Sequence, residues 1–101
     1  MLHLLGRSKV FYLVCFDIVD DRIRNHVVKC LKGYGVRVQK SVFECPGLSE
    51  EKFLKMKHHL EDIINCDEDT VRYYPLCRSC LRNVEFSGIG EGPVENRYRI
   101  V

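Results

Sequence analysis

The sequence predicts an α+β fold, in which short strands alternate with two amphipathic helices along 101 residues. Three observations carry this prediction. The segment Val10–Phe16 is a continuous apolar run, rich in β-branched and aromatic residues, as expected of a buried strand. Two later segments, ending near Tyr34 and Ile64, repeat apolar residues at helical spacing. Extended segments lie between and after these helices.

The end of the first predicted strand is the place where the sequence indicates a functional site. Its two faces are both apolar, so it is expected to be central and covered on both sides. A domain of this size has few residues with which to cover both faces, so we expect a partner chain to cover one of them. Asp17 follows where the apolar run ends and a helix begins. Such an acid either takes part in metal or phosphate chemistry or only binds turn amides, and this stretch alone favours neither interpretation.

Both helices have recognisable ends. Asp20 or Asp21 caps the first helix, which is expected to run to about Tyr34 and to end at Gly33 and Gly35. Ser49 is expected to cap a second helix that runs to about Ile64.

The remaining segments are extended. Val36–Cys45 is predicted to form two short strands joined by a kink or turn at Lys40 and Ser41, and Pro46-Gly47 is expected to end it. Thr70–Leu76 is a strand whose Pro75 indicates an end or an edge, and Asn83–Ser87 is a last short strand.

This order of elements is typical of a ferredoxin-like βαββαβ fold. We expect that domain to span residues 1–87. Residues 88–101 then form a C-terminal tail with an extra strand near Tyr98–Val101 that packs on a dimer partner.

Composition limits the function classes. The chain is 46% hydrophobic and 30% charged, with a formal net charge of +2. Residues 1–45 and 70–101 carry net positive charge and residues 46–69 net negative charge. This distribution suits contact with phosphate, although a solvated surface could show it too. Neither a membrane span nor a signal peptide is evident, so we expect a cytoplasmic protein with no membrane partner.

Six cysteines in such a chain argue against a disulfide framework. Cys15, Cys30 and Cys66 are interpreted as small buried hydrophobic residues. Cys77-x-x-Cys80 has zinc-ligand or redox spacing, but it is a single pair, and free thiols are the favoured interpretation.

Three segments together resemble a known family. They are FDIVDDRIRN, GYGVRVQKSVFEC and VRYYPLCRSC, and they span about Phe11 to Phe86. In order and spacing they are similar to the CRISPR-associated protein two family, the small spacer-acquisition endoribonucleases of prokaryotes. The resemblance implies a ferredoxin-like homodimer with its two sheets facing each other, and with the C-terminal strand laid on the partner.

The resemblance also implies a site. It makes Asp17 the catalytic and metal-binding residue, with the two Asp17 carboxylates of a dimer sharing a divalent metal, usually Mg²⁺. One carboxylate is too few for Mg²⁺, so a shared site is chemically reasonable. Nucleic-acid contacts are expected from four basic residues, and supporting roles from two aromatic ones. These residues are Arg22, Arg24, Arg37 and Lys40, with Phe16 and Phe43 in support.

The sequence departs from the family's pattern at two positions, and two of the implied site residues have an alternative interpretation. Phe16 stands where the family usually has Tyr, and His26 stands where many members have Arg or Lys. Arg24 could equally be a solvated helix arginine, and Phe43 could equally be a core residue.

Two functions of different classes follow. The first is a Mg²⁺-dependent phosphodiesterase that cleaves RNA or DNA through the paired Asp17 carboxylates. The second is a dimeric adaptor that bridges the larger CRISPR acquisition integrase and holds double-stranded DNA on basic patches, without cleavage of its own.

Overall fold

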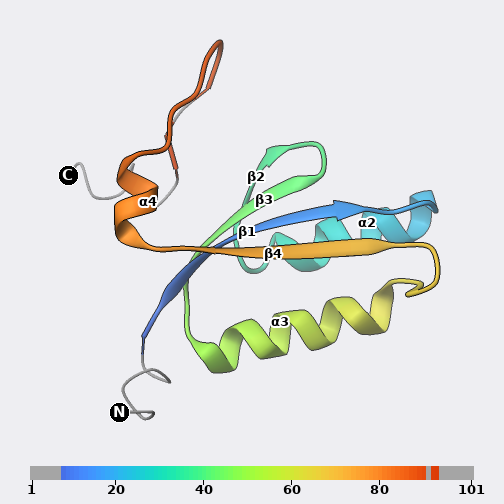
Figure 1. Cartoon of the computed structure of the whole chain (residues 1–101). Helices are drawn as coiled ribbons and strands as arrows, with labels where there is room; N and C mark the ends of the chain where they lie inside the picture. Colours follow the sequence, from blue (N-terminus) through green and yellow to red (C-terminus); the bar gives the residue numbers. More distant parts are fainter. Residues whose placement is uncertain (1–7, 91, 94–101) are drawn as a thin grey trace.

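The computed structural model describes residues 8–90, 92 and 93. Their strands form one antiparallel sheet in the order β2-β3-β1-β4, and the two long helices α2 and α3 lie on one face of it (Figure 1). The elements in chain order are β1 (Val10–Asp17), α2 (Asp21–Leu31), β2 (Val36–Gln39), β3 (Val42–Leu48), α3 (Glu50–Ile63), β4 (Thr70–Leu76) and α4 (Arg78–Arg82). The sequence prediction of a ferredoxin-like βαββαβ fold is therefore confirmed.

The alternation of side chains along β1 divides the sheet into two faces. Val14 and Phe16 point toward α2 and α3 and are buried in the core between sheet and helices. Leu13 and Cys15 lie on the opposite face and are only half-buried. We call the part of this second face near Asp17 the open face; by strand register it comprises Leu13, Cys15, Asp17, Val42, Glu44, Thr70, Arg72 and Tyr74. The sequence predicts that both faces of β1 are covered. Within this single chain, only the face toward α2 and α3 is completely covered.

The helix starts agree with the sequence, whereas one helix end does not. The Asp20 carboxylate accepts the backbone N–H groups of the first turn of α2, and Ser49 Oγ accepts that of Lys52 at 3.1 Å in α3. However, α2 ends at Leu31, so its predicted extension to Tyr34 was wrong. The chain turns away there, with the Gly35 N–H donating to the Leu31 carbonyl.

Gly35 lets the chain that leaves α2 pass close to β3. A Cβ at this position would collide with the carbonyl oxygen of Glu44 and lie 2.8 Å from the Cα of Cys45. The chain leaving α2 therefore passes directly against β3, and only glycine leaves room for that approach.

The predicted pair of strands around Lys40 and Ser41 is confirmed as the β2–β3 hairpin. The expectation that Pro46-Gly47 ends the segment was wrong, because β3 continues to Leu48. An irregularity in the β1–β3 pairing absorbs these residues, and Gly47 has a positive φ of 65°. Proline and glycine are tolerated inside a strand at such a bulge.

The predicted strand at Asn83–Ser87 is absent. The short helix α4, which was not predicted, lies directly before this segment. Asn83 ends this helix, because its N–H bonds to the Cys80 carbonyl and its side-chain amide donates to the Ser79 carbonyl at 3.0 Å. Its polar groups are thus used in capping. The predicted strand at Tyr98–Val101 lies outside the described residues.

The thiols differ in their exposure. Cys15 and Cys30 are half-buried, as expected of small apolar residues, but Cys66 is exposed, so that part of the prediction was wrong. In the part of the chain that the structure describes, no helix has the length and apolar character needed to cross a membrane.

Candidate active site

Asp17 is the last residue of β1 and lies exposed on the open face. It pairs in register with Thr70 of β4, and both line a hollow of about 290 Å³. The other lining residues are Cys15, Phe16, Arg72 and Tyr74. The strand alternation that buries Phe16 on the helical side brings the Asp17 carboxylate to the opposite side, where a substrate can reach it.

Arg72 supplies positive charge to this hollow. It stands opposite Cys15 in the β1–β4 ladder, two residues along β4 from the partner of Asp17. Its Nη1 donates to the Tyr74 hydroxyl at 3.4 Å, and this hydrogen bond raises the pKa of Arg72. A carboxylate and a permanent cation therefore line the same hollow.

Sequence reasoning missed Arg72. The alternation Thr70, Arg72, Tyr74 along β4 shows a polar face, but it does not show which strand lies beside that face. The antiparallel pairing of β4 with β1 supplies this information.

The loop that follows Asp17 is fixed from two sides. Asp69 Oδ1 accepts the Val19 N–H at 3.0 Å, and Asp69 Oδ2 accepts the Asn65 N–H at 2.9 Å. On the other side, Arg24 Nη2 donates to the Ile18 carbonyl at 2.6 Å. The two residues that follow Asp17 are therefore both hydrogen-bonded, Ile18 to the nearby Arg24 in α2 and Val19 to the distant Asp69.

Asp69 was also missed by sequence reasoning, which noted only the net negative charge of residues 46–69. It is the one buried charged residue among the described residues, with 8% of its surface exposed. No signal in the sequence separates it from the exposed Asp67 and Glu68 beside it.

The four basic residues predicted to contact nucleic acid differ in whether their side chains are already hydrogen-bonded within the chain. Arg22 and Lys40 are exposed. Arg24 also pairs with Asp21, and Arg37 donates from Nε and Nη2 to the Lys40 carbonyl at 3.1 and 2.6 Å. Both of these guanidinium groups support local backbone, so the interpretation of Arg24 as a solvated helix arginine was wrong.

The β2–β3 turn brings part of this charge to the site. Phe16 N–H donates to the Ser41 carbonyl at 3.0 Å, which places the turn of Lys40 and Ser41 at the end of β1. The start of α2, with Arg22, follows the same end of β1. Asp17, Arg22 and Lys40 are therefore grouped at one end of the sheet.

The two aromatic residues expected in support lie in the core. Phe16 and Phe43 face the helices, with ring centroids 6.3 Å apart, and Phe43 is completely buried. Their rings hold β1 and β3 against the helical layer, on the side of the sheet opposite the Asp17 carboxylate, although Phe16 also forms part of the lining of the hollow.

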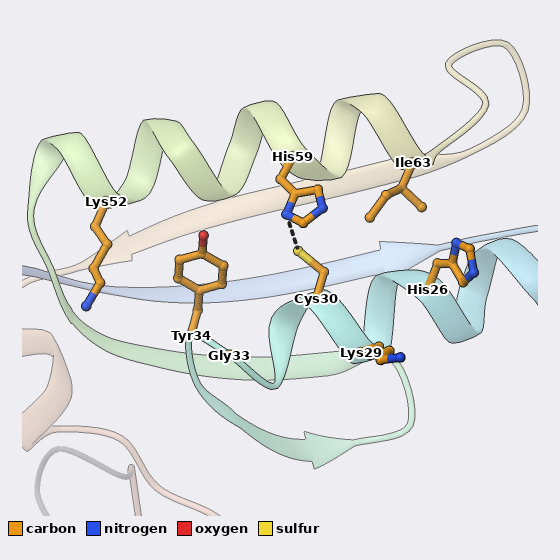
Figure 2. A pocket seen from close by; sticks show the side chains of 8 residues that line it. All are labelled: His26, Lys29, Cys30, Gly33, Tyr34, Lys52, His59 and Ile63. Atoms are coloured by element: carbon orange, nitrogen blue, oxygen red, sulfur yellow. Dashed lines mark hydrogen bonds between the residues drawn. The ribbon is translucent and has the colours of Figure 1, made fainter.

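His26 lies elsewhere, in a groove of about 680 Å³ between α2 and α3 (Figure 2). In this groove Cys30 Sγ lies 3.5 Å from His59 Nδ1. Burial raises the pKa of the Cys30 thiol, which disfavours its thiolate form. The structure separates His26 from the hollow that contains Asp17.

The donor set near Asp17 bears on the expected metal. Across residues 8–90, 92 and 93, no group of three or more His, Cys, Asp or Glu side chains is arranged to hold a metal ion. One exposed carboxylate with a neighbouring Thr70 hydroxyl is half of a plausible Mg²⁺ site, because this ion binds one or two carboxylates and keeps several waters. These residues fit Mg²⁺ when a second copy supplies another carboxylate.

Comparison with known proteins identifies the family. The family model for CRISPR associated protein Cas2 matches residues 10–84. A CRISPR-associated endoribonuclease Cas2 of a Synechocystis species is 44% identical over 77 residues, which are 76% of this chain and 83% of that protein.

Solved structures agree. A hypothetical protein, TT1823, from Thermus thermophilus superposes with a TM-score of 0.76 at 36% identity, over 85% of this chain and 99% of that one. A chain in a partial Cas6-RT-Cas1–Cas2 complex superposes with a TM-score of 0.70 at 30% identity, over 84% and 96%. Together with the βαββαβ sheet, these matches show that the chain belongs to the Cas2 family of CRISPR-associated proteins.

Proposed function

We propose that this protein acts in CRISPR spacer acquisition as a homodimeric, metal-dependent endonuclease with Asp17 as its catalytic residue. The observation that carries the proposal is the exposed Asp17 carboxylate at the end of the central strand, directly before a loop held by Asp69 and Arg24. The endoribonuclease name of the Synechocystis relative supports RNA as the substrate of cleavage.

The open face supports a dimer. Leu13, Cys15 and Val42 are half-buried and apolar at its centre, and Tyr74 is 43% exposed beside them. A second copy placed on this face would cover the apolar centre and bring a second Asp17 to the same interface. That arrangement would cover the exposed apolar face of β1 and would also supply a second carboxylate for the metal.

The charged residues in and near the hollow have separate parts in the proposed chemistry. The two Asp17 carboxylates would hold Mg²⁺, which when bound lowers the pKa of a water and polarises a phosphate oxygen. Arg72 offsets the negative charge of the scissile phosphate. Arg22 and Lys40, at the same end of the sheet, bind flanking phosphates without reading sequence.

A second candidate function is a scaffold that binds double-stranded DNA and the CRISPR integrase without cleaving. Two observations favour it: this chain resembles a chain in a Cas1–Cas2 complex, and its hollow contains a single carboxylate. The same open-face dimer serves both functions, so cleavage must be measured directly.

The test compares wild-type protein with Asp17→Asn on single-stranded RNA and on duplex DNA, with Mg²⁺ and with a chelator. Asp67→Asn, an identical change at an exposed site, is the matched control. We expect Mg²⁺-dependent RNA cleavage that Asp17→Asn lowers ~100-fold or more, since several kcal/mol of transition-state stabilisation are lost.

Light scattering of both variants reports whether the dimer persists. Salt-sensitive duplex binding without cleavage by the wild-type dimer would support the scaffold and exclude the nuclease. A wild-type protein that stays monomeric at high micromolar concentration would contradict the shared site.

A further inference from the structure

Cys77 and Cys80 form a thiol pair at the junction of β4 and α4. Cys77 is the N-cap of α4, and its Sγ accepts the Cys80 N–H at 3.4 Å. The two sulfur atoms are themselves hydrogen-bonded to each other, 3.4 Å apart. Both residues are exposed. The backbone of this turn therefore already holds the sulfurs close to the separation from which a bond can form.

The turn that carries the pair is anchored. Leu81, one residue after Cys80, is 2% exposed. Together with Phe11 of β1 and Cys77, it lines a second hollow that is separate from the one at Asp17. The helical hydrogen bond from the Leu81 N–H to the Cys77 carbonyl, at 3.0 Å, closes the turn around both thiols. Because the turn is fixed by packing, little conformational freedom has to be lost when the sulfurs react.

The two thiols are chemically unequal. Hydrogen bonds from the backbone and side chain of Cys80 lower the pKa of Cys77, because they favour its thiolate. Donation to Cys77, together with its negative charge, raises the pKa of Cys80. This division into an attacking thiolate and a resolving thiol is typical of Cys-x-x-Cys redox pairs.

Structural zinc is the competing use of such a pair. Zinc requires four protein ligands, and the described residues contain no group of three or more metal-binding side chains. The exposed Cys66 is not part of such a group. The geometry of the chain therefore favours thiol exchange over metal binding.

We propose that Cys77 and Cys80 are a reversible dithiol–disulfide site that exchanges with low-molecular-weight disulfides of the glutathione type. This inference is independent of the proposed nuclease activity, since it concerns the end of the sheet where β1 begins and β4 ends, away from Asp17.

The exchange takes place in two steps. The Cys77 thiolate attacks one sulfur of glutathione disulfide, which forms a mixed disulfide and releases one glutathione thiolate. Cys80 then loses its proton to solvent, and its sulfur attacks Cys77 Sγ and releases the second glutathione thiolate. The two cysteines are oxidised by two electrons, glutathione disulfide is reduced by two, and the two protons protonate the released thiolates.

The experiment equilibrates the full chain with glutathione buffers of increasing oxidation, traps free thiols by alkylation after acid quenching, and locates the products by peptide mass spectrometry. We expect an intramolecular Cys77–Cys80 disulfide that dithiothreitol fully reverses. Cys80→Ser should accumulate a glutathione adduct on Cys77, because no resolving thiol remains.

Two further variants complete the test. Cys77→Ser keeps an oxygen that can cap α4, so it should fold, and Cys80 should then react several-fold more slowly than Cys77 does in wild type. Cys66→Ser, which removes another exposed thiol, should leave formation of the pair unchanged. Modification of Cys66 ahead of Cys77, predominantly intermolecular disulfides, or tightly bound zinc that protects both thiols would each overturn the proposal.

Discussion

Asp69 accepts the backbone N–H of Val19 at 3.0 Å, across 50 positions of the sequence. The loop that leaves the candidate catalytic strand is thereby joined to the loop that leads into β4. Since Thr70 pairs with Asp17, the two strands that border the hollow are connected both by their ladder and by this carboxylate.

Replacing Asp69 with Asn should lower both stability and activity. Each carboxylate oxygen of Asp69 accepts one N–H, whereas the amide of Asn offers only one acceptor. We expect a loss of about 1–3 kcal/mol in unfolding free energy, because one partly buried N–H is left without its acceptor. Urea denaturation checks the stability, and RNA cleavage at saturating substrate checks the position of Asp17.

Asp67→Asn is the control for this change, because it lies exposed in the same loop. It should leave both measurements within about 0.5 kcal/mol of wild type. Equal effects of the two substitutions would show that loop charge, and not the Val19 contact, is responsible.

Arg24 and Arg22 should separate structural support from phosphate binding. Arg24 bonds to Ile18 and Asp21, so Arg24→Gln should cost about 1–3 kcal/mol of stability. Arg22 is exposed and available to phosphate, so Arg22→Gln should leave stability unchanged. It should reduce the slope of log affinity against log salt by about 0.9 on duplex DNA.

Salt titrations of binding and thermal denaturation of both variants measure these effects. If Arg24→Gln lowers the salt slope as much as Arg22→Gln and leaves stability intact, then Arg24 binds phosphate and the backbone contact is secondary.

Alkaline pH should destabilise the protein through two buried groups. Burial raises the pKa of Cys45 and of Tyr73 to about 12, from ordinary values of 9.0 and 10.0. Both groups stay protonated in the folded chain while the unfolded chain loses their protons. Stability should therefore be complete below about pH 9 and decline as the pH rises toward about 12.

Urea unfolding across this pH range measures the decline. Tyr73→Phe should make it shallower, because one of the two protons no longer differs between the states. Tyr74→Phe, a change at the exposed neighbour, should leave the profile as in wild type. A pH-independent stability up to pH 11 would contradict the assignment.

The strengths and failures of sequence reasoning have physical causes. Asp17 was identifiable because an apolar strand ends there, and strand and helix periods are local properties of the chain. Arg72 was not, because its place beside Asp17 depends on which strands pair. The helix α4 was missed because its five residues are too few to show a helical period.

The bulge at Pro46-Gly47 shows the same limit in another form. These residues ordinarily mark a turn, and only the register of β1 against β3 keeps them in the strand. Asp69 was hidden by composition, since acidic residues in a loop usually face water. In each case the deciding contact lies far away in the sequence.

The alternation of β1 has an evolutionary consequence. Tyr12, Val14 and Phe16 pack in or against the core, whereas the odd-numbered residues near the strand end lie on the open face. Neighbouring positions are therefore under different selective constraints. Variation at Val14 or Phe16 is limited by volume, as in any packed interior. Variation at Leu13 or Cys15 can change the surface presented around Asp17 while the fold persists. A single strand thus allows the site to diversify without the scaffold having to change.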